Sequence, residues 1–281
     1  SITDQMLDSG LGRDTTVVAL GGGVVGDLAG FVAATFLRGV PYIQAPTSLL
    51  AMIDASVGGK TGVDTSHGKN LVGAFCQPAV VIADVSTLAT LPPGHVSAGM
   101  AEAIKHGVIQ DAAYFRHIVE QAGRILERES DAIIDVVRRS VEIKADVVSE
   151  DEREQGRRAI LNFGHTIGHA LEAVSEYGLL HGEAVALGMT AEVKLGCKLG
   201  ITDTAVIPEL QTAISALSLP SEINPPLDPD ALLAAMAQDK KNRAGAVTFA
   251  LPARLGSMAR GPDGSWTQSV PKQVITEALA P

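Results

Sequence analysis

The segment from Thr15 to about Leu37 constrains the fold more than any other part of this sequence. A run of β-branched and apolar residues ends at the three glycines 21–23, and apolar residues at helical spacing begin at Val24. Glycine allows a tight turn close to a ligand, and the helix that follows presents free N–H groups that suit a phosphate. The spacing fits the dinucleotide-binding pattern only inside a glycine run, so dinucleotide binding and a purely structural turn both stay open.

Strands and helices alternate along the first third of the chain, and helices dominate after it. The apolar segments 42–45 and 79–83 predict two more buried strands and hence a parallel, Rossmann-like sheet. Helical spacing of apolar residues is found in the segments 96–109, 111–127, 130–149, 157–175, 181–199, 203–217 and 270–279, with a short strand at 246–251. We predict an α/β part over residues 1–93 and a mostly α-helical domain over 94–281, with the active site in the cleft between them.

Composition argues against several classes of function. The 281 residues carry a formal net charge of −10 and contain no run of lysine and arginine, which disfavours a nucleic-acid partner. No apolar stretch approaches the roughly 20 residues of a membrane span. Cys76 and Cys197 lie in no CxxC pair, so a reduced, cytoplasmic setting is expected. The chain begins at Ser1 with neither a signal peptide nor an initiator methionine, which indicates processing or truncation.

Three of the seven histidines lie close together in the sequence. On a helix, His165 and His169 share one face with Cβ atoms about 5–6 Å apart, and His181 opens the next helix. We favour a metal site over hydrogen-bonded core histidines, and spacing alone nominates His165 and His169 as paired ligands. Glu102 and Lys105 lie on a helix of small apolar residues, where a carboxylate is costly unless it is paired or binds a metal. A surface ion pair is the alternative for these two residues.

The segment 54–61 is similar to the end of a phosphate-binding P-loop. Its spacing fails, because Asp54 stands where that motif has its first glycine, so a nucleoside triphosphatase is disfavoured. Lys60 on this glycine-rich loop can still hold an anionic oxygen, and residues 66–70 form a second basic loop. Two solvated surface loops are the alternative. Weaker cationic signals, each more typical of a solvated face, lie at Lys144, Arg157, Arg158, Lys240 and Lys241.

Taken together, these segments resemble the 3-dehydroquinate synthase family of sugar-phosphate cyclases. The resemblance runs from about Gly12 to about Gly256 and rests on GGGVVGD, DASVGGKTGVD, GKNLVGAF, MAEAIKHG, LNFGHTIGHA, LHGEA and DKK, in the family's order. It implies conversion of 3-deoxy-arabino-heptulosonate 7-phosphate to 3-dehydroquinate and phosphate. In that reaction NAD oxidises a ring hydroxyl, phosphate is eliminated, the hydride returns and an intramolecular aldol step closes the ring. The resemblance thus implies a carbon–oxygen lyase of the shikimate pathway, which leads to the aromatic amino acids.

The resemblance also implies a role for each matching residue. Ligands of a zinc or cobalt ion are expected at Glu102, His165 and His181. His169, which spacing alone nominated as a ligand, is then expected to contact the substrate instead. The residues expected around the substrate are Asp54, Lys60, Lys105, Lys144, Arg158, Asn162 and His169, with Lys144 and Arg158 at its carboxylate. The residues expected at its phosphate are Lys60, Asn70, one or both of Lys240 and Lys241, and Arg38 from a neighbouring subunit, which implies a homodimer. NAD contacts are expected at Gly22, Gly23, Val24, Asp27, Thr47, Ser48, Lys69, Thr90 and Leu91.

The sequence departs from the family mainly at its front, where the family normally has further strands and helices that contact the adenosine side of NAD. We therefore expect 1–93 to be a partial NAD-binding domain with weak affinity, and 94–281 to bind metal and substrate. Smaller departures are Ser48 for threonine and His106 for tyrosine. The alternatives are a sister cyclase acting on a sugar phosphate without a carboxylate, a polyol dehydrogenase, and an inactive metal-binding fragment. The carboxylate-binding pattern argues against the first, and the phosphate-binding lysines argue against the second.

Overall fold

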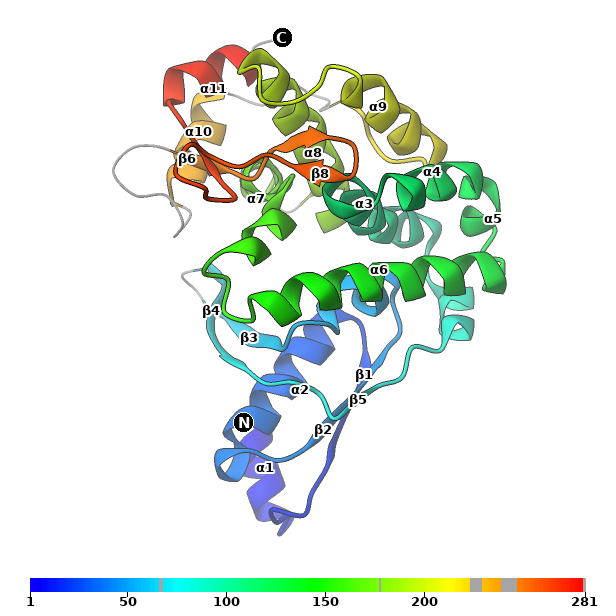
Figure 1. Ribbon diagram of the computed structural model, residues 1–281. Helices are drawn as coiled ribbons and strands as arrows, with labels where there is room; N and C mark the ends of the chain where they lie inside the picture. Colours follow the sequence, from blue (N-terminus) through cyan, green and yellow to red (C-terminus); the bar gives the residue numbers. More distant parts are fainter. Residues whose placement is uncertain (66–67, 177, 223–228, 239–246, 280–281) are drawn as a thin grey trace. The chain divides into compact units, whose positions relative to one another are not determined.

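The computed structural model describes residues 1–65, 68–176, 178–222, 229–238 and 247–279 (Figure 1). The chain forms two compact units: the first contains 1–96 and 133–145, and the second contains 97–132 and 146–281. The helices α3 (Pro93–Gln110) and α6 (Ser130–Glu150) therefore contribute to both units. No sequence pattern indicated that the middle of α6 joins the first unit. Among the described helices, none is both long enough and apolar enough for a bilayer crossing.

The first unit is built on a three-stranded parallel sheet in the order β1-β2-β5. Its strands are β1 (Val17–Gly21), β2 (Tyr42–Pro46) and β5 (Val80–Val81). Helix α2 (Gly23–Thr35) follows β1 at once and packs closely on the sheet, because a methyl group on Gly30 would come within 3.3 Å of the Tyr42 ring. This is the strand–glycine–helix unit that the sequence predicts. The unit also contains the short helical segments η1 (Phe36–Arg38), η2 (Ala51–Ala55) and η3 (Val85–Thr90).

Two elements of the first unit are not apparent from the sequence. Strands β3 (Lys60–Thr65) and β4 (Gly68–Phe75) form an antiparallel hairpin, so the prediction of two basic loops is wrong for the paired residues. Glycines and polar residues interrupt the alternation that marks a strand. Gly73 is required there, because a methyl group would come within 2.2 Å of the carbonyl oxygen of Thr61. Helix α1 (Ile2–Asp8) also forms, with a capping box at its start.

The second unit is mostly helical. Besides parts of α3 and α6, its helices are α4 (Ala112–Glu120), α5 (Ala122–Leu126), η4 (Arg157–Asn162), α7 (His165–Val174), α8 (His181–Lys198), α9 (Val206–Ala216), α10 (Pro229–Gln238) and α11 (Lys272–Leu279). Its short antiparallel strand pairs are β6 (Val247–Phe249) with β9 (Gln268–Val270), and β7 (Pro252–Arg254) with β8 (Ser257–Met258). Buried side chains of α7, α8, α10, α11, β6 and β9 form its core. The parallel sheet and this helical unit confirm the predicted fold class.

Two segments predicted as single helices are divided in the structure. Residues 111–127 form α4 and α5, which meet at Gln121. The prediction of one helix over 157–175 is wrong, because η4 ends at Asn162 and α7 begins at His165. Gly164 lies between them with a φ of 79°, which glycine adopts readily and which no α-helix contains. His165 therefore lies in the first turn of a new helix.

Helices α3, α7 and α8 pack with their backbones in close contact. A methyl group on Gly188 of α8 would lie 2.0 Å from the carbonyl oxygen of Gly164, and one on Gly168 would lie 3.1 Å from that of Ala184. A methyl group on Gly182 would lie only 1.8 Å from the carbonyl oxygen of Ala98 on α3. Because the separation of packed helices depends on the side chains at the contact, these glycines allow an unusually short separation.

Candidate active site

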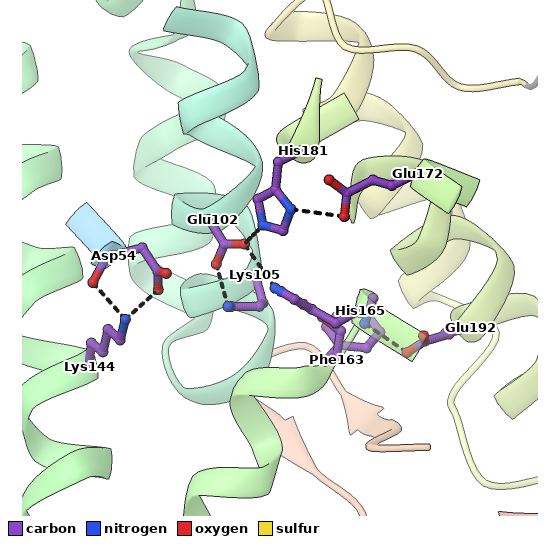
Figure 2. Close-up of polar contacts among 10 residues, drawn as sticks. Asp54, Glu102, Lys105, Lys144, Phe163, His165, Glu172, His181 and Glu192 are labelled. Carbon is purple, nitrogen blue, oxygen red and sulfur yellow. Dashed lines mark hydrogen bonds and ion pairs between the residues drawn. The ribbon is translucent and has the colours of Figure 1, made fainter. Parts of the chain in front are cut away.

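A carboxylate from the middle of one helix of the second unit and two histidines from the first turns of two others converge (Figure 2). Glu102 on α3 is fully buried, and its Oε1 lies 3.3 Å from Nε2 of His165 and 3.6 Å from Nε2 of His181. His165 begins α7 and His181 begins α8, so helix packing brings together residues that are far apart in the sequence. The Lys105 ammonium forms an ion pair with Oε2 of Glu102 from the next turn of α3.

The second ring nitrogen of each histidine is held by another group. Nδ1 of His165 lies 3.1 Å from the carbonyl oxygen of Phe163, and Nδ1 of His181 lies 3.4 Å from Oε2 of Glu172. A carbonyl oxygen only accepts hydrogen bonds, so Nδ1 of His165 donates and its Nε2 keeps a lone pair. The Glu172 carboxylate likewise accepts from Nδ1 of His181, so Nε2 is the nitrogen of His181 that can bind a metal ion once it has lost its proton. Glu172 is not apparent from the sequence, where a glutamate on a helix is typical of a solvated face.

This arrangement fits a divalent metal ion. One ligand atom from each of Glu102, His165 and His181 lies within 4.8 Å of the other two, and one carboxylate with two imidazoles is a ligand set that zinc accepts. His169 lies beside them, with its ring centroid 5.2 Å from that of His165. It groups with Glu172 and His181 instead, and no metal-binding group of the described residues contains both His165 and His169.

The charges at the three residues depend on one another. Burial alone would raise the pKa of Glu102, but Lys105 and the two histidines outweigh it and hold the pKa well below its usual range. Burial lowers the pKa of His165, and the Lys105 ammonium adds to that effect. Burial also disfavours a charged His181, yet its contacts with Glu102 and Glu172 raise its pKa to about 10. In the metal-free chain His181 therefore carries a proton that a metal ion would displace.

Arg158 and Asn162 are positioned by the loop that precedes η4. The carboxylate of Asp151 accepts hydrogen bonds from the backbone N–H groups of Gln155, Gly156 and Arg158, at 2.9, 2.7 and 2.9 Å. The buried Arg158 guanidinium donates to the carbonyl oxygen of Glu152. The Asn162 amide donates to Oε1 of Glu154 at 2.6 Å and borders a pocket of about 770 Å³.

The neighbouring Arg157 has a different environment. Its guanidinium pairs with Glu150 and Asp146 and donates to Oε1 of Gln110 at 3.0 Å. About a quarter of its side chain is exposed, and its two carboxylate partners are about half exposed. Arg157 therefore belongs to a surface network, whereas Arg158 is buried.

Two of the residues predicted to contact the substrate are paired in the first unit. Nζ of Lys144 lies 2.8 Å from Oδ1 of Asp54 and donates to the Asp54 carbonyl oxygen at 2.6 Å (Figure 2). Lys60 and Asp27 border a pocket of about 290 Å³ with part of the β3–β4 hairpin. Burial raises the pKa of Asp27 to about 6, against the opposing effect of Lys144.

The residues predicted to contact NAD lie mainly at the carboxyl ends of two parallel strands. Gly22 and Gly23 follow β1 and open α2, and Thr47 and Ser48 follow β2. The N–H of Thr47 donates to the carbonyl oxygen of Gly21 at 2.9 Å, so the two turns are joined. This edge of a parallel sheet is where α/β proteins usually bind nucleotides.

The remaining predicted residues are more dispersed. Val24 is exposed in the first turn of α2, Arg38 is exposed at the end of η1 with a φ of 68°, and Thr90 and Leu91 close η3. Lys69 and Asn70 belong to β4. Lys240 and Lys241 lie outside the described residues.

The fold is shared with solved sugar-phosphate cyclases. A structure of 2-deoxy-scyllo-inosose synthase complexed with carbaglucose-6-phosphate, NAD+ and Co2+ matches with a TM-score of 0.92 and 28% identity, over 99% of this chain and 77% of that one. The 2-epi-5-epi-valiolone synthase of Streptomyces hygroscopicus subsp. jinggangensis, with NAD+ and Zn2+ bound, matches with a TM-score of 0.88 and 31% identity, over 99% and 76%. Fold and site together therefore define a sugar-phosphate cyclase.

Within that class, the chain belongs to the 3-dehydroquinate synthase family. The family models for the N-terminal and C-terminal parts match residues 1–98 and 99–242. The 3-dehydroquinate synthase of Desulforamulus reducens is 50% identical over 256 residues, which is 91% of this chain and 71% of that protein. This confirms the resemblance seen in the sequence and the expected class of phosphate-eliminating lyase. The sister cyclases are less favoured, because their identities are 28% and 31%.

Proposed function

We propose that this chain converts 3-deoxy-arabino-heptulosonate 7-phosphate into 3-dehydroquinate and inorganic phosphate. The observation that carries the proposal is the convergence of Glu102, His165 and His181 in a chain of this family. When bound, NAD supplies a transient hydride acceptor, and a zinc or cobalt ion supplies Lewis acidity toward hydroxyl groups of the substrate. The cyclase structures solved with NAD+ and with Co2+ or Zn2+ support both cofactors.

In this proposal Glu102, His165 and His181 hold the ion. Lys105 balances the charge of Glu102, and its ammonium lies where it can donate to a substrate oxygen near the ion. His169 lies on the same helix face as His165. Among the described residues it groups with Glu172 and His181 and not with Glu102, so it is not counted among these ligands. It is therefore assigned to the substrate.

The carboxylate of the substrate is assigned to Lys144 and Arg158. Both side chains are nearly fully buried, and a buried cation needs acceptors, which a substrate carboxylate supplies with a full charge. A guanidinium can bind both carboxylate oxygens at once, whereas an ammonium acts as a point charge. Asp54, paired with Lys144, is assigned to substrate hydroxyl groups, and Asn162 to a neighbouring oxygen.

The phosphate of the substrate is assigned to a separate set of cationic and amide groups. Lys60 borders the pocket beside the hairpin, and Arg38 is exposed, as a residue that serves a neighbouring subunit must be. This assignment requires a homodimer. The full set is Lys60, Asn70, one or both of Lys240 and Lys241, and Arg38 of the second subunit.

NAD is assigned to the turns that follow β1 and β2. The free N–H groups at the start of α2 suit a pyrophosphate, and glycine lets it come close to the backbone. The assigned residues are Gly22, Gly23, Val24, Asp27, Thr47, Ser48, Lys69, Thr90 and Leu91. The two free cysteines support a reducing, cytoplasmic setting for this reaction.

Phosphate release tests the proposal directly. With NAD and zinc present, the wild-type chain should release phosphate from the heptulosonate phosphate but not from glucose 6-phosphate, which lacks a carboxylate. Arg158→Ala should lower kcat/KM by about two to three orders of magnitude, as expected for the loss of a charge-assisted contact. Arg157→Ala, in the surface network, is the matched control and should retain most activity. Equal turnover of both sugars, or a silent Arg158→Ala, would point to a sister cyclase.

A further inference from the structure

Helix α7 begins in a buried position where its own preceding residue cannot cap it. The residue before the helix is Gly164, which has a φ of 79° and no side chain. A methyl group at this position would lie 2.4 Å from Cγ of Met189 and 3.0 Å from the carbonyl oxygen of Val185, both on α8. A serine or aspartate cap therefore does not fit, and the first N–H groups of α7 need acceptors from elsewhere.

Glu192 of α8 supplies those acceptors. Its side chain is fully buried, its Oε2 accepts the N–H of Gly164 at 2.7 Å, and its Oε1 accepts the N–H of Ile167 at 3.2 Å. The positive end of the α7 dipole stabilises a carboxylate there. Burial raises the pKa of Glu192 to about 8, although the backbone N–H groups oppose that rise. A group this costly to bury is expected to serve a purpose beyond filling space.

The position of this cap relates it to the metal site. His165 is the first residue of α7, directly after Gly164, and His181 is the first residue of α8, which also carries Glu192. The glycine contact between Gly188 and Gly164 sets how closely the two helices approach. Apolar side chains such as Ile167 of α7 and Leu187 of α8 belong to the same core, but apolar packing has no directional bonds. The two hydrogen bonds of Glu192 add a directional link at the first turn of α7.

We propose that Glu192 is a positioning residue of the metal site, which holds His165 at the distance from His181 that a divalent ion requires. This inference rests on the proposed function, because it presupposes that Glu102, His165 and His181 bind the ion. Glu192 itself is no ligand: its oxygens face backbone N–H groups of α7. It acts through the first turn of the helix that carries His165.

The test is zinc affinity measured by competition with a chelator, in the full chain without NAD or substrate. In Glu192→Gln one amide oxygen can replace one of the two acceptors, while the NH2 group meets the other N–H. We expect zinc to bind about 10- to 100-fold more weakly, the range found when groups that orient metal ligands are lost. Glu192→Ala should weaken it further. With Co2+ as the probe, the visible absorption spectrum of Glu192→Gln should also change, which a loss of stability alone would not cause.

Thr190→Val is the matched control, because Thr190 is a buried polar residue of α8 whose hydroxyl donates to the carbonyl oxygen of Ala186 within that helix. It should leave zinc affinity and the Co2+ spectrum unchanged even where it lowers the thermal unfolding temperature. Wild-type affinity in both Glu192 variants would overturn the inference, as would an equal loss in Thr190→Val. If Glu192→Ala does not fold, Glu192→Gln still decides. His181→Ala distinguishes a failure of this inference from a failure of the proposed function. If this variant keeps full zinc occupancy, the metal ligands themselves are wrongly assigned.

Discussion

At the scale of single residues, the two candidate metal-binding histidines make the same pattern of contacts. Each directs Nε2 toward Glu102 and has Nδ1 held by an acceptor, the Phe163 carbonyl for His165 and the Glu172 carboxylate for His181. An acceptor at Nδ1 fixes the ring orientation and makes Nε2 a better ligand. The carboxylate is the stronger acceptor, so the two histidines are not equivalent.

Removing Glu172 should therefore weaken metal binding without removing a ligand. We expect Glu172→Ala to bind zinc about 10- to 100-fold more weakly, because His181 loses the group that orients its ring. Glu172→Gln keeps an acceptor oxygen and should lose less. Competition with a chelator measures the zinc dissociation constants of both variants. Wild-type affinity in Glu172→Ala would mean that the 3.4 Å contact does not orient His181.

Metal binding should depend on pH through His181. The pKa of His181 is raised to about 10 in the metal-free chain, above the ordinary value of 6.5, so its proton stabilises the folded metal-free chain. That contribution is fully present below pH 6.5 and is lost as the pH rises through about 10. Zinc must displace this proton, so its affinity should rise with pH up to about 10.

Isothermal titration calorimetry in buffers of different ionisation enthalpy tests this expectation. At pH 7.5 we expect about one proton to be released from His181 for each zinc ion bound. Cysteine ionisation does not contribute, because the candidate ligand set contains no cysteine. Zero proton release at pH 7.5 would show that His181 is already neutral before the ion binds.

At the scale of elements, the loop 151–156 organises the start of η4. One carboxylate, that of Asp151, accepts three backbone N–H groups, and the same loop supplies acceptors to Arg158 and Asn162. The hydrogen bonds hold the pKa of Asp151 below its usual value against the effect of burial. The loop is therefore fixed by its own backbone, and the two side chains assigned to the substrate depend on it.

Asp151→Ala should consequently raise KM for the heptulosonate phosphate more than it lowers kcat. We expect kcat/KM to fall about tenfold to a hundredfold, because displaced binding groups cost roughly that much. Asp151→Asn keeps one oxygen for two of the three N–H groups and should lose less. Zinc content should be unchanged in both variants.

The matched control for Asp151 is Asp111→Ala, which removes the carboxylate that caps α4 through the N–H of Tyr114. It should cost about 1 kcal/mol of stability and leave KM unchanged. A wild-type KM in Asp151→Ala would reject the role of the loop. If Arg158→Ala were silent as well, the assignment of Arg158 would fail instead.

At the scale of the whole molecule, the candidate ligands of the ion all belong to one compact unit. Glu102, His165 and His181 come from α3, α7 and α8 of the second unit, while the parallel sheet belongs to the first. The ion should therefore stabilise the second unit directly. The sheet of the first unit gains no such ligand contact.

Hydrogen exchange with and without zinc measures this difference. Zinc at 100 times its Kd should stabilise the folded chain by about 2.7 kcal/mol and slow amide exchange in α3, α7 and α8. Exchange in β1 and β2 should change much less. Protection confined to the first unit would contradict the metal-site assignment, and His181→Ala should abolish the protection in the second.

The sequence predicted those parts of this molecule that depend on local patterns. The strand, glycine turn and helix over residues 15–37 follow from residue types in order along the chain. The pairing of Asp54 with Lys144 joins residues 90 positions apart, and no local pattern indicates it. The hairpin β3–β4 was missed because glycine and polar residues obscure its alternation.

The same limit applies to the acidic residues around the candidate site. Glu172 and Glu192 are glutamates on helices, where this residue is more typical of a solvated face, and only packing shows that both are buried. Arg157 and Arg158 are adjacent and chemically identical, yet one lies in a surface network and the other is buried. Which of the two arginines is buried depends on the direction of the η4 backbone. That direction depends on the hydrogen bond between the Gly156 N–H and the Asp151 carboxylate, which is present only in the folded chain.

Gly188 is not a candidate ligand and has no side chain, so a survey that ranks variants by the side-chain contacts they remove would score it as harmless. A single methyl group there meets the carbonyl oxygen of the residue before His165 at 2.0 Å, so an alanine must push α7 away from α8. His165 would then move away from His181, although all three candidate ligands would still be present in the chain. We expect cells that carry this variant to grow poorly and to recover when extra zinc is added to the medium, although the substituted residue is a glycine that binds no metal.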